Sequence, residues 1–282
     1  MNQDAAPPED PRDLLRRYGR TDDAGIDLAA AALALAALAR PEKPAAPYLA
    51  HLQTLTADVA TAAGRTGTPE SAERIRILNT ILFETHGYAG DRDTYNDLRN
   101  ANLMSVIDRR RGLPIALSIL YVHAARAQGW PIEGVNFPGH FLLRLRNGTG
   151  GIVIDPFNGG RVRSAAELRE LIKSMEGESA ELRREHCRPA GNRQMLLRLQ
   201  NNIKLRLLRD DKLAEAVEVI GHMLLLAPDD PGLWHEAGVL HGRVGNLRAA
   251  VAALERLATL SRGGPDHGRA VQLLAEMKSR LN

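Results

Sequence analysis

The chain has 282 residues, 44% of them hydrophobic, which is enough for one large domain or two modest domains with buried cores. Its formal net charge of +3 comes from 37 basic and 34 acidic residues, so charge alone does not indicate a nucleic-acid-binding protein. The single cysteine excludes an internal disulfide framework and fits a reducing cytosol. Without a basic segment ahead of an apolar run, and with the run at 28–39 too short to span a bilayer, we expect a cytoplasmic protein.

The first part of the chain, residues 1–78, is predicted to be a tail followed by a lobe of helices. Residues 1–10 have the composition of a tail, and Asp10 is a candidate N-cap for a short helix. Residues 27–39 are rich in alanine and leucine, which favour helix, and two more helical patterns follow, the second from Ile75.

The middle of the chain contains one long apolar segment. Residues 115–128 are almost continuously apolar, so a helix there would be buried on nearly every side. Pro114 suits the first turn of this helix, where its missing N–H has no partner to lose, and Gly129 suits the end. The pattern therefore predicts a central buried helix.

Two strand patterns follow this helix. Residues 140–145 and 152–154 are separated by a turn at 147–151, which predicts a hairpin. Folding about that turn would bring His140 within hydrogen-bond reach of Asp155. An aspartate in that place would hold the imidazole in one tautomer and favour its charged form.

Five ordered sequence blocks at compatible spacings carry a resemblance to a known family: Leu78–Phe83, Asn96–Asn100, Val106–Ile115, Glu133–Phe141 and Asp155–Gly160. Together they resemble the SirB-type transglutaminase-like family, in which such a core precedes tetratricopeptide repeats. The resemblance implies a mostly helical α+β fold with a transglutaminase-like, papain-like core at 79–175, after the N-terminal lobe and before C-terminal helical hairpins.

The resemblance also implies a triad that has lost one member. In the broader superfamily the central helix opens with Gly-x-Cys, and by that pattern Gly112 and Leu113 match while Pro114 occupies the cysteine position. His140 and Asp155 correspond to the other two members. A proline offers no nucleophilic atom, so the resemblance implies a fold whose activity is in question.

Two other side chains are considered as the nucleophile. Ser118 lies on the same helix as Pro114, four residues on, although a serine in an apolar helix usually bonds its own backbone. Cys187 is the only thiol and lies outside every matching block, which favours a structural or incidental residue.

Several polar side chains near the matching blocks are candidates for binding. Those at 91–102 could line a cleft or belong to a solvated loop. The candidate binding residues are Asn96, Asp97, Arg99, Asn100, Arg111, Asn136, Phe137 and Asn158. We expect no cofactor and no metal, because the sequence contains no glycine-rich phosphate loop, no His-x-x-x-His pair and no second cysteine.

The C-terminal part contains an internal repeat. Residues 211–216 recur as 245–250 at an offset of 34 residues, the period of tetratricopeptide repeats. Pro228 closes the first repeat, whereas Arg262 stands at the equivalent place in the second. We therefore predict a connector at 176–191 and, from 192 to 282, repeat helices with a final capping helix from Gly268.

These features favour a non-catalytic transglutaminase-like protein that binds a protein or peptide through its cleft and its repeats. One alternative is an amide or ester hydrolase or acyl-transfer enzyme with His140 as general base, Asp155 as its orienter, and Ser118 or a water as nucleophile. Another is an RNA-associated or ribosome-associated factor that binds through short arginine clusters. No membrane partner is expected, and the oligomeric state is open. The arginine clusters are Arg16-Arg17, Arg109–Arg111, Arg161 with Arg163, and Arg183-Arg184.

Overall fold

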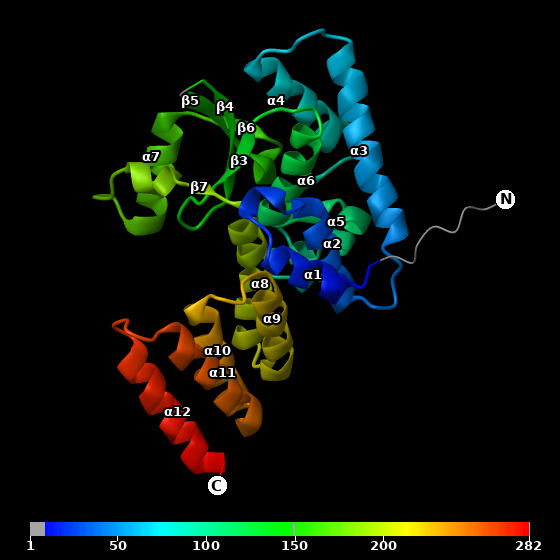
Figure 1. Ribbon diagram of the computed structural model, residues 1–282. Coiled ribbons are helices and arrows are strands. Elements are labelled where there is room, and N and C mark those ends of the chain that lie inside the picture. The colour runs from blue at the N-terminus through cyan, green and yellow to red at the C-terminus, as the bar shows by residue number, and fades with distance from the viewer. Residues whose placement is uncertain (1–8, 149, 282) are drawn as a thin grey trace, which may run out of the picture. The chain divides into compact units, whose positions relative to one another are not determined.

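The computed structural model describes residues 9–148 and 150–281 (Figure 1). Most of the predicted N-terminal tail, residues 1–8, lies outside the described residues. Contacts divide the chain into two compact units. One unit is residues 26–199, and the other joins the chain up to residue 25 to the chain from residue 200 onward.

The unit of residues 26–199 begins with a lobe of helices, as predicted. Its helices are α2 (Leu28–Ala39), α3 (Ala46–Gly64) and α4 (Ser71–Asn79), and α4 runs on into one π-helical segment, η2 (Thr80–Thr85). Asp27 caps α2, because its carboxylate accepts hydrogen bonds from the N–H groups of Ala29 and Ala30. Three of these elements, α2, α3 and α4, pack on the central helix α6 (Pro114–Arg126).

The central helix α6 has the predicted place and burial. Pro114 is its first residue, and every residue from there to Val122 is buried. Gly129, at φ +69°, is the last residue of the turn that leads out of the helix. Before α6 the chain forms η3 (Leu98–Ala101), α5 (Leu103–Arg109) and a short parallel strand pair, β1 (Ala89–Gly90) with β2 (Arg111–Gly112).

The same unit contains an antiparallel sheet of five strands in the order β6-β5-β4-β3-β7. The predicted hairpin is present, with Leu143 of one strand opposite Ile154 of the next. Strands β3 and β4 also pack on α6. The strands are β3 (Ile132–Val135), β4 (Leu142–Asn147), β5 (Gly150–Asp155), β6 (Arg161–Arg163) and β7 (Pro189–Ala190).

One boundary differs from the expectation. We expected the first strand of the hairpin to begin at His140, but His140 lies in a turn before β4. The turn forms because Gly139 adopts φ +62° and the His140 N–H bonds back to the Pro138 carbonyl at 2.7 Å. After the sheet, α7 (Ala165–Glu176) begins with a Ser164–Glu167 capping box, and η5 (Arg184–Cys187) leads to β7.

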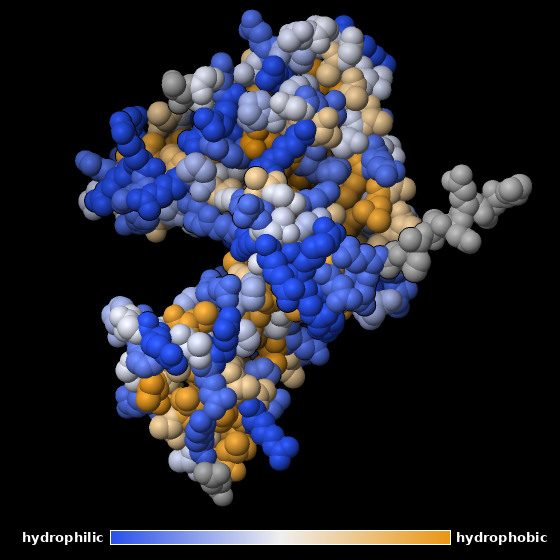
Figure 2. Space-filling view, in the orientation of Figure 1, coloured by the Kyte–Doolittle hydropathy of each residue, from blue (hydrophilic) through white to orange (hydrophobic). Residues whose placement is uncertain are grey.

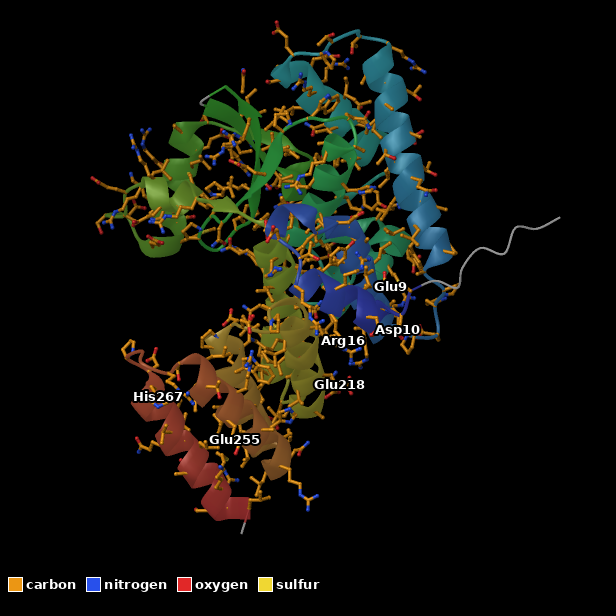
Figure 3. The ribbon with its side chains drawn as sticks, in the orientation of Figure 1. Glu9, Asp10, Arg16, Glu218, Glu255 and His267 are labelled. Carbon is orange, nitrogen blue, oxygen red and sulfur yellow. The ribbon has the colours of Figure 1, made fainter. Side chains whose placement is uncertain are left out.

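The second unit is helical. It contains α1 (Pro11–Gly19), the end of α8 (Asn192–Arg209), α9 (Leu213–Leu226), α10 (Pro231–Arg243), α11 (Leu247–Leu260) and α12 (His267–Leu281). Asp10 caps α1 by accepting from the Arg12 N–H at 2.7 Å, and Figure 3 shows it at the start of that helix. Helix α1 packs on α9 so closely that a Cβ on Gly19 would lie 2.1 Å from the Leu225 carbonyl oxygen.

The repeat helices pack through small residues at the predicted positions. Ala216 and Ala250 are both fully buried. A Cβ on Gly238 of α10 would lie 2.7 Å from Leu254 of α11, so these two helices approach at a glycine. The Trp234 indole N–H donates to the Pro228 carbonyl at 2.7 Å, which fixes α10 against the chain that precedes it. The final helix begins at His267, one residue before the predicted start.

Candidate functional site

A short turn before β4 presents His140, and Arg198 of α8 holds it in place. Arg198 donates to the carbonyl oxygens of His140 at 3.0 Å and Phe137 at 3.3 Å, and it also bonds the Asn136 side chain. Its guanidinium lies 5.2 Å from the centre of the Phe141 ring. The main chain on both sides of His140 is therefore fixed by one arginine.

His140 and Asp155 form a hydrogen-bonded pair. The His140 Nε2 lies 2.9 Å from Asp155 Oδ1, and the aspartate side chain is fully buried while the histidine side chain is 14% exposed. Because a carboxylate only accepts, Nε2 carries a hydrogen and the second ring nitrogen, Nδ1, is left for other partners. Among residues 9–148 and 150–281, no hydrogen bond to that nitrogen is present.

The second oxygen of Asp155 is also fully engaged. Asn158 donates to Oδ2 at 2.7 Å, and Arg163 donates to the same oxygen through Nη2 at 2.6 Å and Nε at 3.2 Å. Burial alone would raise the pKa of Asp155, but the hydrogen bonds and charge of His140, with those of Arg163 and Asn158, lower it to about 2. Asp155 is therefore a carboxylate at neutral pH.

The turn after Asp155 is closed by two glycines. Gly159 and Gly160 have φ values of +67° and +72°, which favour glycine. The Asn79 side chain donates to the Gly160 carbonyl at 3.1 Å, and the Tyr121 hydroxyl donates to the Asn79 amide oxygen at 3.3 Å. Burial raises the pKa of Tyr121, so its hydroxyl stays protonated. This contact network ties the turn to α4 and α6.

One aromatic ring, Phe157, lies beside the imidazole and is itself in contact with Tyr95 and Arg92. The Phe157 ring meets His140 edge-on at 6.1 Å and Tyr95 at 5.8 Å. The Arg92 guanidinium lies 5.7 Å from the Phe157 ring and bonds the Asn158 amide oxygen. Tyr95 is 39% exposed, so a partner can reach this edge of the site.

The N-terminus of α6 carries no nucleophile. Pro114 is buried at its first position, and the buried Ser118 hydroxyl donates to the Pro114 carbonyl at 2.7 Å. No hydrogen bond joins Ser118 to His140 within the part of the chain that the structure describes. The serine version of the enzyme hypothesis requires that bond, and this structure does not bring the two side chains into that arrangement.

Ser118→Ala should therefore have a small effect. Loss of a bond from a serine to its own helix backbone is expected to change the free energy of unfolding by less than about 1 kcal/mol. Urea denaturation of the two proteins measures this change. If the purified protein hydrolyses an amide or ester and the alanine variant does not, the serine has a chemical role after all.

Cys187 belongs to a different part of the same unit. With Glu133 and Arg144 it lines a pocket on one face of the sheet. Burial raises the pKa of its thiol, although nearby Arg144 acts in the opposite direction, so the thiol is protonated at neutral pH. A protonated thiol is a poor nucleophile, which supports a structural residue.

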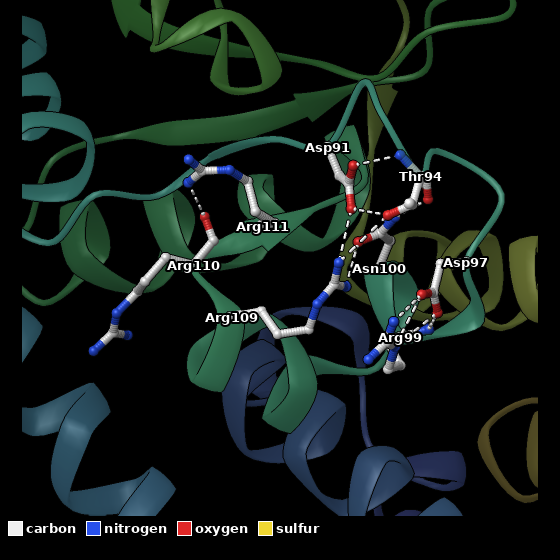
Figure 4. A network of polar contacts seen from close by, with 8 residues as sticks. All are labelled: Asp91, Thr94, Asp97, Arg99, Asn100, Arg109, Arg110 and Arg111. Atoms are coloured by element: carbon white, nitrogen blue, oxygen red, sulfur yellow. Dashed lines mark hydrogen bonds and ion pairs between the residues drawn. The ribbon is translucent and has the colours of Figure 1, made fainter.

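Most of the candidate binding residues at 91–102 belong to a separate polar network (Figure 4). Arg109 bonds the buried Asp91 at 2.9 Å and the buried Asn100 amide oxygen at 2.8 Å. Thr94 donates to both oxygens of Asp91. Burial opposes the ionisation of Asp91, but bonds from Thr94 and then Arg109 outweigh it and lower its pKa.

This Asp91–Arg109 network positions the start of the central helix. The Asn100 carbonyl accepts from the N–H of Leu113, the residue before α6, at 2.9 Å. Asp97 caps η3 and pairs with Arg99 at 2.6 Å, whereas Asn96 is exposed. Residues 91–102 therefore help to fix the start of α6, in addition to the role in binding that we expected from the sequence.

The structure thus brings some candidate residues together and separates others. His140, Asp155 and Asn158 form one hydrogen-bonded group, and Asn136 supports it through Arg198. The remaining candidates lie elsewhere. The Phe137 side chain is fully buried among Val135, Leu142, Leu168 and Ile172, and Arg111 bonds the carbonyls of Gly87 and Arg110.

Sequence reasoning missed several residues that complete the site. Arg163 was assigned to an arginine cluster, although its place two residues into a strand paired with β5 is the signal that could have found it. Phe157 and Arg92 are in contact because β1 packs on the turn after β5. Arg198, which bonds the His140 carbonyl, lies on α8. No sequence pattern relates these segments.

The arginine clusters are largely neutralised within the chain. In each of the four clusters at least one arginine is ion-paired with a carboxylate, which lowers the charge available to a nucleic acid. The pairs are Arg16–Asp13, Arg17–Glu9, Arg109–Asp91, Arg161–Glu167, Arg163–Asp155 and Arg183–Glu185. Among residues 9–148 and 150–281, no group of three or more histidine, cysteine or acidic residues is placed to hold a metal ion.

Comparison with known families agrees with this architecture. The family model described as the transglutaminase-like superfamily matches residues 46–201, more than half of the chain, and the chain belongs to this family. A tetratricopeptide-repeat model matches residues 203–277. The protein is therefore a transglutaminase-like domain followed by tetratricopeptide repeats.

Several proteins are similar to this chain. A UPF0162 protein of Xylella fastidiosa strain Temecula1 is 36% identical over 190 residues, which cover 66% of this chain and 68% of that protein. A UPF0162 protein of Vibrio cholerae is 30% identical over 60% of this chain and 62% of its own length. Human F-box only protein 21 is 41% identical over 34% of this chain and 16% of its own. The solved structure of menin aligns over 89% of this chain and 69% of its own at 10% identity, with a TM-score of 0.39 that is too low to inform the fold.

Proposed function

We propose that this chain is a nucleophile-lacking transglutaminase-like protein, of the SirB type and cytoplasmic, that binds a protein or peptide at the His140–Asp155 site and through its repeats. One observation carries the proposal. The histidine and aspartate are held in hydrogen-bonded geometry, while the first position of α6 is the buried ring of Pro114. A pair kept in place without an attacking atom fits recognition better than covalent catalysis.

The chemistry around His140 suits a peptide. The Nδ1 atom accepts a hydrogen bond when the ring is neutral and donates one when it is charged. Phe157 offers ring surface beside the imidazole, and the exposed Tyr95 and the Arg92 guanidinium lie against Phe157. Polar groups that fix orientation beside aromatic surface are typical of binding sites for small ligands and peptides.

The repeat helices offer a second surface. Tetratricopeptide repeats expose extended faces that commonly bind proteins. Four large hydrophobic side chains are exposed on α10, α11, α12 or the turns between them, at 37–45%: Val239, Val244, Val271 and Leu281. Figure 2 shows hydrophobic atoms on the surface of these repeat helices. None of the helices in the described residues is both long and apolar enough to cross a membrane.

Site-specific photo-crosslinking tests the proposal. A benzoylphenylalanine in place of Tyr95, in cells of the native host, is expected to crosslink to a discrete protein, because the side chain is exposed beside Phe157. His140→Ala in the same chain should reduce that crosslink at least about tenfold if the imidazole contacts the partner. Mass spectrometry identifies the captured protein.

The matched control places the same photo-crosslinking residue at Leu49, which is 43% exposed on α3. It should not capture the same protein. A crosslink from Tyr95 that persists unchanged in His140→Ala, or the absence of any crosslink from Tyr95, contradicts binding at this site.

A second candidate function has one observation in its favour. Because Asp155 holds Nε2, the unbonded Nδ1 of His140 could take a proton from a water that attacks an amide or ester. Turnover of such substrates by the purified protein, lost in His140→Ala and kept in Ser118→Ala, would establish this water-dependent hydrolase and overturn the non-catalytic proposal.

A further inference from the structure

The three consecutive arginines before the central helix have three different environments. Arg109 is ion-paired with Asp91, and Arg111 donates to the carbonyls of Gly87 and Arg110. The Arg110 side chain points away from the Asp91–Arg109 network, as Figure 4 shows. Within the described ranges no ion pair joins Arg110 to a carboxylate.

The backbone of Arg110 is in a conformation that favours glycine. Its φ of 57° is left-handed, at the C-terminal end of α5, where glycine is the usual residue. The Arg110 side chain makes three contacts. Its guanidinium lies 4.7 Å from the centre of the Tyr88 ring and donates to the Tyr88 hydroxyl and to His51 Nε2. Strain of this kind is commonly kept where a side chain has a function.

A pocket of about 490 Å³ opens beside Arg110, and its wall includes Lys43, Tyr48, His51 and Asp108. Asp108, the one carboxylate among the residues that line this pocket, is ion-paired with Arg40: its Oδ2 accepts from Arg40 and from the Tyr48 hydroxyl, each at 3.1 Å. Lys43 is exposed at the rim. Two cations without a carboxylate partner therefore face the pocket.

His51, which also lines this pocket, is a neutral imidazole whose ring N–H can donate a hydrogen bond. Arginine only donates, so the bond from Arg110 makes Nε2 an acceptor and places the ring hydrogen on Nδ1. Burial, then the charges of Arg110 and of His86, lower the pKa of His51 to about 4, and Asp58 acts weakly in the opposite direction. The Tyr88 hydroxyl stays protonated because burial raises its pKa.

We propose that this pocket binds a small phosphate-bearing anion, with Arg110, Lys43 and the Nδ1–H of His51 as its donors. The volume lies in the range of small-molecule sites, roughly 300–1,000 Å³. A guanidinium, an ammonium and an imidazole N–H supply the charge-assisted bonds that a phosphate takes. Two unpaired cations favour a phosphate dianion over a carboxylate. The site shares none of its residues with the His140–Asp155 site, so the two proposals stand separately.

Histidine NMR of the full chain tests this proposal with inorganic phosphate as the probe. The His51 ring signal is assigned by its loss in His51→Gln. Millimolar phosphate is expected to shift that signal saturably and to raise the pKa of His51 by at least about one unit, because a bound anion offsets the charge of Arg110. Sodium chloride at equal ionic strength and sodium acetate at equal concentration should produce neither change.

Two variants each remove one of the proposed phosphate donors, one at an exposed side chain and one at a position where the backbone favours glycine. Lys43→Gln removes an exposed ammonium and should weaken phosphate binding about tenfold, whereas Lys173→Gln on α7 should not. In Arg110→Gly the new glycine adopts the left-handed φ without strain, so the fold should be kept and the circular dichroism spectrum unchanged. Saturable phosphate binding should nevertheless be abolished.

Three outcomes would overturn the proposal. The first is a His51 signal that does not respond to phosphate. The second is an equal response to chloride or acetate, which indicates screening or a general carboxylate site. The third is unchanged phosphate affinity in both Lys43→Gln and Arg110→Gly.

Discussion

Asp155→Ala is expected to lower the free energy of unfolding by about 3–5 kcal/mol, the cost of removing one partner from a buried ionic group. Asp155 is fully buried, and its loss leaves the largely buried guanidinium of Arg163 and the imidazole of His140 without their carboxylate. The Asn158 amide also loses its acceptor. Urea denaturation followed by circular dichroism measures the change.

The matched control for this substitution is Asp93→Ala, in an exposed position two residues after Asp91. It should change the free energy of unfolding by no more than about 0.5 kcal/mol. An Asp155→Ala variant as stable as the Asp93→Ala variant would mean that the carboxylate does not hold the site together.

The pH dependence of stability follows from the same carboxylate. The pKa of Asp155 is lowered from 3.8 to about 2 in the folded protein, so its ionic contribution is fully present above pH 3.8 and is lost as the pH falls through about 2. Asp155→Asn removes this titration. Between pH 4 and pH 2 the variant should therefore lose stability less steeply than the wild type, and parallel curves would contradict the assignment.

Gly160→Ala is expected to destabilise the protein by about 2–4 kcal/mol. The left-handed φ of +72° disfavours alanine by about 1 kcal/mol. In addition, the new Cβ would lie 1.8 Å from the Asn79 amide oxygen, so Asn79 must leave its bond to the Gly160 carbonyl and its contact with Tyr121. The thermal midpoint and the urea midpoint both report this loss.

Gly67→Ala separates the two causes. Gly67 has nearly the same φ, +74°, but a Cβ there would meet nothing within 4 Å. It should therefore show only the backbone effect of about 1 kcal/mol. If Gly67→Ala and Gly160→Ala are equally destabilised, the contact between the turn and Asn79 adds nothing to stability.

The helices of this chain could be read from sequence because their signals are local. The apolar run of α6 begins at Pro114 and ends before Gly129, and Asp10 caps α1 as predicted. The alanine-rich helix α2 was also predicted, with the difference that residue 27 is its N-cap and not its first residue. The paired strands that approach His140 and Asp155 could also be predicted, because an alternating pattern interrupted by a turn defines a hairpin. The start of β4 could not, since the turn at Pro138-Gly139 depends on backbone geometry.

What the sequence by itself determined is the set of elements and the residue types available to the site: a helix that begins with proline, a histidine before one strand and an aspartate at the end of the next. The tertiary structure alone decided that Arg163 and Asn158 share the Asp155 carboxylate and that Arg198 fixes the His140 turn. It also decided that Ser118 bonds its own helix and that Arg110 faces a pocket. The reason is physical: helix caps and hydrophobic periods act over a few residues, whereas these contacts join side chains that only the packing of distant segments brings together.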